Sequence, residues 1–149
     1  IMTAGSELSA LLADELWSLV GASSNPQAAG FVLEMVKTIR GLGGIAVTST
    51  QGMQDLFGLE GGKYGKGILD SSRIKLIMQM EEQEARLIQD VLNLSEDEVR
   101  QITRFRRGEG LLCIGYNHVP IAFHASQQEY DIITTSPTDL HRRAKEESA

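Results

Sequence analysis

The chain reads Leu-Leu-Ala-Asp-Glu at residues 11–15 and Ile-Ala-Val-Thr-Ser-Thr-Gln at residues 45–51, with a helical pattern between the two runs. Each run begins apolar and ends polar, as a buried strand that reaches the edge of a sheet does. If the runs form neighbouring parallel strands, Asp14, Glu15 and Gln51 gather at their carboxyl ends, where open α/β sheets bind ligands. This layout is typical of one half of a nucleotide-hydrolysing site.

The first run also fits one amphipathic helix. Its leucines follow the spacing i, i+3, i+4, i+8 and i+11, at Leu8, Leu11, Leu12, Leu16 and Leu19. Taken by itself, this spacing favours the helix, and Asp14 and Glu15 would then lie on a solvated face. The two interpretations differ in whether the first run pairs with the second as a strand.

Composition limits the classes of protein to which the chain can belong. It has 149 residues, 42% of them hydrophobic, which is enough for one ordinary domain with a core. The formal charge of -6 argues against a broad nucleic-acid-binding surface. The single cysteine, Cys113, excludes an internal disulfide framework, and its apolar neighbours predict a buried, unreactive thiol. No apolar run approaches the roughly 18 residues of a membrane span, so we expect a soluble segment.

Helix and strand patterns alternate along the rest of the chain. Asn25 and Pro26 predict a helix start, because asparagine accepts from free backbone amides and proline loses no bond at the first helical position. Ser95 and Glu98 predict another start through a capping box. The expected helices lie at residues 26–40, 81–92 and 96–105, the expected strand at residues 73–80, and the expected hairpin at residues 111–116 and 119–125, about Asn117 and His118.

The glycine-rich stretch at residues 58–67 invites comparison with a phosphate-binding loop. Such a loop requires glycine, four residues and then Gly-Lys-Ser/Thr, so that its backbone amides cradle phosphate. Here Glu60 stands at the first glycine position, and Gly67 stands where a hydroxyl would bind magnesium. We therefore expect a mobile surface loop rather than a phosphate site.

Several short motifs occur in a specific order along the chain. They are Asp14-Glu15, Arg40-Gly41, Gly43-Gly44, Gln51, Asp55-Leu56, Gly65-Lys66-Gly67, Ser71-Ser72 and Arg-Arg-Gly-Glu-Gly-Leu-Leu at residues 106–112. With these motifs, residues 8–135 resemble the carboxyl-terminal part of the large ATPases of conjugation and type IV secretion systems. The resemblance implies an α/β fold: a partial RecA-like P-loop ATPase domain, with a mostly parallel sheet flanked by helices and an antiparallel edge hairpin. We expect residues 1–7 to be disordered or a cloning remnant, and residues 136–149 to be a frayed terminal helix.

The same resemblance implies roles for the polar residues of the two runs. Asp14 matches the Walker B aspartate, which holds Mg²⁺ through water, and Glu15 matches the neighbouring glutamate that orients and deprotonates the attacking water. Gln51 matches the polar residue that senses the γ-phosphate of ATP or the lytic water. ATP and Mg²⁺ are therefore the expected ligands of the parent protein.

ATPases of this class work as rings, so the resemblance also implies partners. An arginine from one subunit of a homohexamer would act in the neighbouring site, and Arg40, Arg106 and Arg107 are the candidates. By default Arg104, Arg106 and Arg107 would form a solvated patch or pair with the acids at residues 96–98. Other expected partners are secretion-channel and coupling proteins at the cytoplasmic face of the cell membrane, and the acidic charge does not indicate nucleic acid.

The chain departs from the family pattern because it contains no Walker A motif. We expect that motif upstream in the parent protein, and we expect the segment alone to be inactive. Two alternatives stay open. A DNA-translocating ATPase of the coupling-protein or cell-division class would share Asp14, Glu15 and Gln51. A non-catalytic protein-interaction domain would use the loop at residues 58–67 and the basic tail, with the acids merely at the surface.

Overall fold

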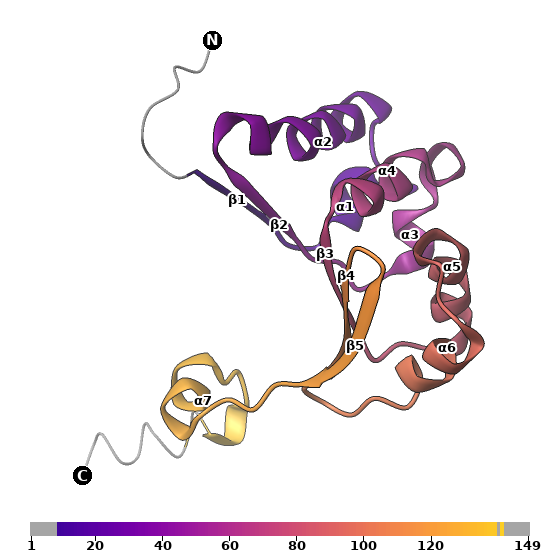
Figure 1. Ribbon diagram of the computed structural model, residues 1–149. Helices are drawn as coiled ribbons and strands as arrows, with labels where there is room; N and C mark the ends of the chain where they lie inside the picture. Colours follow the sequence, from indigo (N-terminus) through magenta and orange to yellow (C-terminus); the bar gives the residue numbers. More distant parts are fainter. Residues whose placement is uncertain (1–8, 140, 142–149) are drawn as a thin grey trace.

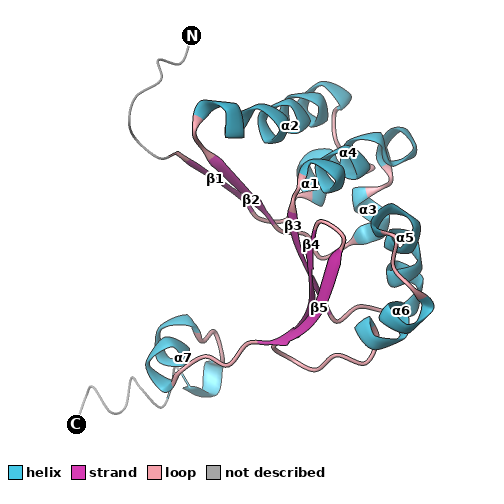
Figure 2. Cartoon of the chain, in the orientation of Figure 1, coloured by secondary structure: helices cyan, strands magenta, loops and turns pink. Residues whose placement is uncertain are grey.

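The computed structural model describes residues 9–139 and 141. Most of its helices lie against one face of two small sheets, and the helix at residues 127–133 lies apart from them (Figure 1). In chain order the elements are β1 (Ala10–Ala13), α1 (Trp17–Val20), α2 (Pro26–Thr38), η1 (Ile39–Leu42), β2 (Ile45–Thr48), α3 (Met53–Leu56), η2 (Leu59–Gly62), α4 (Lys63–Ser71), β3 (Ile74–Met78), α5 (Glu82–Leu92), α6 (Glu96–Ile102), β4 (Glu109–Ile114), β5 (Asn117–Ala122) and α7 (Gln127–Ile133). Figure 2 shows strands and helices alternating along the first half of the chain. The predicted α/β class is confirmed.

The first sheet joins β1 to β2 in parallel, so the strand interpretation of residues 11–15 is correct. Ala13 stands opposite Thr48, and the Ser49 amide donates to the Ala13 carbonyl oxygen at 2.9 Å. The alternative helix is wrong, because the backbone of this segment pairs with a neighbouring strand and the helix α1 begins only at Trp17. Pairing at a distance along the chain has overridden the local leucine spacing.

The second sheet has the order β3-β4-β5, and both of its pairings are antiparallel. The hairpin that joins β4 to β5 turns at Gly115 and Tyr116, and not at Asn117 and His118 as the sequence suggested. Gly115 has a φ of 61°, a left-handed conformation that glycine adopts without strain, whereas Asn117 pairs with Ile114 as the first residue of β5. β5 is an outer strand of this sheet, and Pro120 lies within it opposite Leu111.

The glycine-rich stretch is not a mobile surface loop, and that expectation is wrong. It forms η2 and the first half of α4, in which Tyr64, Gly65 and Ile68 are buried. A Cβ atom on Gly65 would lie 2.5 Å from the Leu56 carbonyl oxygen. At this position glycine therefore allows α4 to pack closely against α3, rather than making the chain flexible.

The helices and the covered faces of the strands form one core. It is built from apolar side chains that are less than a tenth exposed, namely Leu16, Val20, Ala29, Met53, Leu56, Tyr64, Ile68, Ile77, Ala85, Ile88, Leu94, Val99, Ile102, Leu111 and Cys113. The buried thiol of Cys113 agrees with its apolar surroundings, and burial raises its pKa. The predicted capping box of Ser95 and Glu98 is confirmed at the start of α6.

The opposite faces of both sheets are open and apolar. Their exposed side chains are Leu12, Ile45, Val47, Ile74, Leu76, Met78, Ile114 and Val119. The expected strand at residues 73–80 forms as β3, in which Ile74, Leu76 and Met78 are on the exposed side and Ile77 faces the core. Alternation shows which residues share a face but not which face the helices cover, and here they cover the face of Lys75 and Ile77.

The carboxyl-terminal region leads away from the sheets (Figure 1). α7 begins with a capping box of Ser126 and Glu129, and none of its residues is buried. The predicted tail at residues 1–7 and most of the predicted terminal helix at residues 136–149 lie outside the described residues. In the described part of the chain, no helix combines the length and the apolar character needed to cross a bilayer.

Candidate nucleotide-hydrolysis site

Polar side chains gather where β1 and β2 end, because the two strands run parallel and stop at the same level. Ala13 and Thr48 are the last paired residues, so Asp14 and Ser49 follow them side by side. The chain is fixed at this point by backbone bonds: the Leu16 amide donates to the Ser49 carbonyl oxygen at 2.8 Å. The structure thus brings together the residues that the two sequence runs placed at a common edge.

Asp14 is held as a carboxylate by its neighbours. The Ser49 hydroxyl and the Glu15 backbone amide both donate to its Oδ1, the latter at 2.9 Å. The bond from Ser49, followed by the bond from Glu15, lowers the pKa of Asp14 below its ordinary value of 3.8. Asp14 therefore stays negatively charged over the whole physiological pH range, as a residue that binds a hydrated cation must.

Glu15 has its carboxylate fixed from two sides. The indole Nε1–H of Trp17 donates to Oε2 at 2.7 Å, and the side-chain amide of Gln51 donates to Oε1. The backbone of Glu15 has a φ of 52°, a left-handed conformation that glutamate seldom adopts. This conformation turns the chain from β1 toward α1 within a few residues, and it aims the side chain at Gln51.

The loop that carries Gln51 follows β2 directly. Gln51 is exposed, while the preceding Thr50 has a hydroxyl oxygen that is buried and has no hydrogen-bond partner among the described residues. Buried hydroxyl groups are normally paired in proteins. An unpaired hydroxyl beside Gln51 is therefore consistent with a further partner at this edge of the sheet.

These residues fit Mg²⁺ and ATP in part. In the described part of the chain, no group of three or more His, Cys, Asp or Glu side chains could hold a metal ion directly. Mg²⁺ in nucleotide sites keeps several waters and needs only one or two carboxylates, and Asp14 supplies one that is ionised. The glycine-rich stretch does not supply a phosphate-binding loop, because residues 58–67 form η2 and part of α4 and do not match the required sequence.

The candidate arginines are not brought to this site. Arg40 lies in η1, which precedes β2 and so stands at the opposite end of that strand from Gln51. Arg106 and Arg107 are exposed in the connection between α6 and β4. Within the described residues, no hydrogen bond or ion pair joins any of the three to Asp14 or Glu15.

Of the two default expectations for Arg104, Arg106 and Arg107, pairing with the acids at residues 96–98 is wrong, whereas all three side chains are exposed, as a solvated patch requires. The acids of α6 pair elsewhere: Glu96 with Arg86, Asp97 with Arg100, and Glu98 with His118. Arg106 and Arg107 therefore make no ion pair with residues 96–98.

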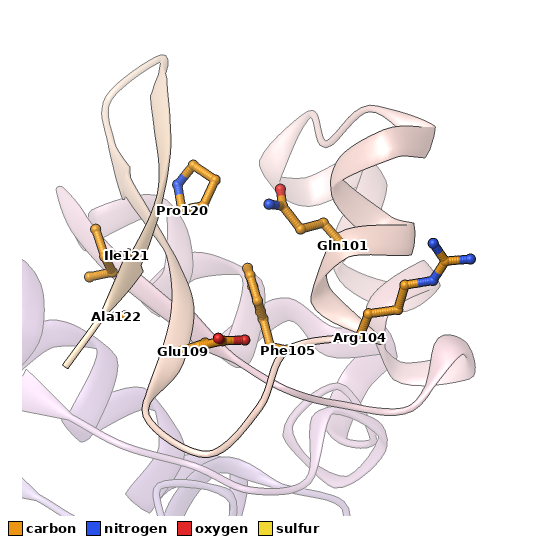
Figure 3. A pocket seen from close by; sticks show the side chains of 7 residues that line it. All are labelled: Gln101, Arg104, Phe105, Glu109, Pro120, Ile121 and Ala122. Carbon is orange, nitrogen blue, oxygen red and sulfur yellow. The ribbon is translucent and has the colours of Figure 1, made fainter. Parts of the chain in front are cut away.

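A shallow hollow of about 370 Å³ lies elsewhere on the molecule, between α6 and β5. Figure 3 shows Gln101 and Phe105 pointing into the space beside Pro120, and Arg104 pointing away from it. None of the residues that line it belongs to the edge of the first sheet. Chemistry, rather than the size of a cavity, therefore identifies the candidate site.

Sequence reasoning missed two residues of the site, Ser49 and Trp17. Ser49 could have been found by aligning the two apolar runs, since Ala13 opposite Thr48 places Asp14 next to Ser49. Trp17 follows Glu15 by two residues, and only the left-handed turn at Glu15 brings its indole back to the carboxylate. No local pattern reports such a turn.

The fold is similar to that of VirB4 of Thermoanaerobacter pseudethanolicus, with a TM-score of 0.75 and 32% sequence identity. The match covers 83% of this chain and 33% of that chain, so the chain spans about a third of the length of this relative.

A second similar structure is the genome packaging NTPase B204 from Sulfolobus turreted icosahedral virus 2. In complex with ATP-gammaS it matches with a TM-score of 0.56 and 15% identity, over 78% of this chain and 52% of that chain. In complex with AMPPCP the TM-score is 0.58 at the same identity, over 78% of this chain and 53% of that chain. At this identity the likeness concerns the fold alone. No family model and no curated protein matches the chain. The resemblance found in the sequence is therefore confirmed: the chain is similar to a VirB4-type ATPase of type IV secretion systems over about a third of that protein's length.

Proposed function

We propose that this chain supplies the Walker B and sensor half of an ATP site in a motor ATPase that energises type IV secretion or conjugative DNA transfer. One observation carries the proposal. Two consecutive acids end β1, and a glutamine from the end of the adjacent parallel strand contacts the second of them, Glu15. The similarity to VirB4 supports the class of ATPase.

The proposed reaction is attack of water on the γ-phosphorus of ATP, which releases ADP and inorganic phosphate. Glu15 accepts the proton of the water as the new oxygen–phosphorus bond forms and the bond to the bridging oxygen breaks. Gln51 orients that water or contacts the γ-phosphate. Asp14 accepts hydrogen bonds from the water shell of a bound cation. Bound Mg²⁺ supplies positive charge that neutralises the phosphate oxygens.

The phosphate-binding half of the site comes, in this proposal, from the upstream part of the parent protein. The 149 residues contain no run that matches the phosphate loop. We therefore expect the isolated chain to release no phosphate from ATP above the rate of a protein-free blank. Measurable turnover by the purified chain, at a rate proportional to its concentration, would contradict this expectation.

We further propose that the parent protein forms a homohexameric ring at the cytoplasmic face of the cell membrane, where it contacts channel and coupling proteins. Arg40, Arg106 and Arg107 remain the candidates for an arginine that enters the neighbouring site. All three are exposed, and none contacts Asp14 or Glu15 within the described residues of its own chain, which is what action on a neighbour requires.

The proposal is tested by Glu15→Gln in the longer protein that carries a phosphate loop. Losing the proton acceptor should reduce kcat by at least about 100-fold while ATP still binds. Glu34→Gln is a matched control, because Glu34 is an exposed glutamate on α2. Failure of the unmodified longer protein to hydrolyse ATP, or full activity of the Glu15→Gln variant, would refute the proposal.

A DNA-translocating ATPase, the rival class, would share Asp14, Glu15 and Gln51. The similarity of this chain to a genome packaging NTPase is at 15% identity and concerns the fold alone. Direct stimulation of the longer protein's ATPase by DNA would favour that rival. Dependence of the ATPase on channel components would favour the secretion motor.

A further inference from the structure

Trp17 is the single tryptophan of the chain, and it contacts the proposed catalytic base. It is the first residue of α1 and is half-buried, and its indole N–H lies 2.7 Å from Glu15 Oε2. The function proposed above assigns no role to this residue. Among the described residues, Trp17 and Gln51 are the two groups that donate to the Glu15 carboxylate.

The two donors are anchored differently. Trp17 is the first residue of α1, and both Leu16 before it and Val20 at the end of this helix are buried in the core. The Trp17 carbonyl oxygen also accepts from the Gly21 amide at 2.7 Å. Gln51, by contrast, is exposed on the loop after β2. The indole therefore stands on a packed element, while the amide stands on a solvent-facing segment.

We propose that Trp17 is a positioning residue for Glu15: its N–H holds Oε2, so that Oε1 is the oxygen presented to the attacking water. In this proposal Gln51 occupies Oε1 only until water and the γ-phosphate take its place. The inference rests on the proposed function for its kinetic consequence. The Trp17–Glu15 contact itself can be measured without any turnover.

Loss of the indole N–H should act on the chemical step. Without it the carboxylate rotates about its side-chain bonds, and the base is no longer held within hydrogen-bond reach of the water. Because this proposal gives Trp17 no contact with the phosphates or the adenine of ATP, the affinity for ATP should not change. The expected result is a fall of about 10- to 100-fold in kcat with KM unchanged.

The first experiment uses the 149-residue chain and the fluorescence of its only tryptophan. Glu15→Gln replaces the charged acceptor of the indole N–H, so the emission maximum or intensity of Trp17 should change. Glu34→Gln leaves the emission as it was, because Glu34 lies on the exposed side of α2. An emission spectrum that Glu15→Gln does not alter would overturn the contact and the inference with it.

The second experiment uses the longer, ATP-hydrolysing protein. Trp17→Phe removes the donor, and replacement of Trp17 by benzothienyl-alanine removes it while keeping the bicyclic ring, with sulfur in place of N–H. Both should lower kcat at constant KM, and the sulfur isostere should do so without lowering the melting temperature. Leu19→Ala, at an exposed position of α1, is the control.

The outcomes separate the two proposals. If the unmodified longer protein hydrolyses no ATP, the proposed function fails, whatever the fluorescence shows. If it hydrolyses ATP and the sulfur isostere matches its kcat, the positioning role of Trp17 is refuted and the proposed function stands. If Trp17→Phe does not fold, the isostere alone decides.

Discussion

Ser49, the residue after β2, donates its hydroxyl hydrogen bond to the carboxylate of Asp14, the residue after β1. The bond crosses between two strands whose last paired residues are Ala13 and Thr48. Parallel pairing therefore does more than assemble the sheet here, since it brings a hydroxyl next to an acid 35 residues away.

Ser49→Ala should raise the pKa of Asp14 toward its ordinary value of 3.8. The hydrogen bond favours the charged carboxylate, so the pKa of Asp14 is lower in the folded than in the unfolded state. The contribution of this bond to folding stability is therefore present above the unfolded pKa and is lost as pH falls through the folded pKa. NMR titration of the Asp14 carboxyl carbon in the isolated chain measures this pKa. Ser24→Ala, whose hydroxyl binds the Ser18 carbonyl instead, should leave the midpoint unchanged. An equal midpoint in Ser49→Ala would disprove the role of the serine.

Gln51→Ala in the longer protein should lower kcat about 10- to 1,000-fold, as removal of a donor to a reacting group does elsewhere. The physical reason is the loss of the amide that contacts Glu15 across the two strand ends. Steady-state phosphate release measures the effect. Gln54→Ala, an exposed glutamine on the neighbouring α3, should keep normal turnover. Equal rates in both variants would remove Gln51 from the site.

Glu98 should stabilise the contact between the hairpin and the helical layer. Its Oε1 lies 2.6 Å from His118 Nδ1, and the two side chains are 21% and 13% exposed. Glu98→Gln should lower the free energy of unfolding by about 1–3 kcal/mol at neutral pH, because a partly buried charged hydrogen bond is lost. Urea denaturation measures the loss. Glu96→Gln, at a side chain that is 59% exposed, should change it much less.

The same pair predicts a pH dependence. Burial raises the pKa of Glu98, but the hydrogen bonds from Ser95 and His118 outweigh it, so the pKa lies below its ordinary value of 4.5. Its contribution to stability is therefore complete above about pH 4.5 and is lost as pH falls through the folded pKa. Stability curves of the wild type and Glu98→Gln should converge in that acidic window. A constant difference down to pH 2 would contradict the assignment.

Gly65→Ala should destabilise the fold by about 1–3 kcal/mol, because the added methyl group would overlap backbone. Its Cβ would stand 2.5 Å from the Leu56 carbonyl oxygen and 2.9 Å from Leu56 Cγ. Gly41→Ala is the matched control, since a Cβ there meets nothing within 4 Å. Thermal unfolding monitored by circular dichroism compares the two. Equal melting temperatures would mean that α4 can move away from α3 without loss.

The sequence predicted the placement of the acids but not how they are held. Two apolar runs that end in polar residues imply a shared edge if they pair, and the pairing of Ala13 with Thr48 realises it. The indole of Trp17 reaches Glu15 only through a left-handed backbone angle, which depends on how α1 packs. Contacts of this kind are set by the tertiary structure, so a local pattern cannot supply them.

Elsewhere composition misled the prediction. A run rich in glycine suggested flexibility at residues 58–67, yet Gly65 is buried because Leu56 passes close to it. That close approach joins two helices and leaves no trace in the run itself. Similarly, Leu76 and Ile77 are both apolar, and only the position of the helices makes one exposed and the other buried.

Pro120 in β5 has a consequence for how the molecule behaves in concentrated solution. The two-residue turn closes on Ile114 and Asn117, and alternation along the hairpin then places Pro120 where its ring nitrogen points away from β4. Any other residue at this position would expose a backbone N–H on the outer edge of β5, where a strand from another molecule could pair with it. Pro120→Thr should accordingly speed the growth of thioflavin-binding fibrils from the folded chain. The Pro120 ring thus prevents strands of other molecules from pairing with this edge of the sheet and so limits aggregation.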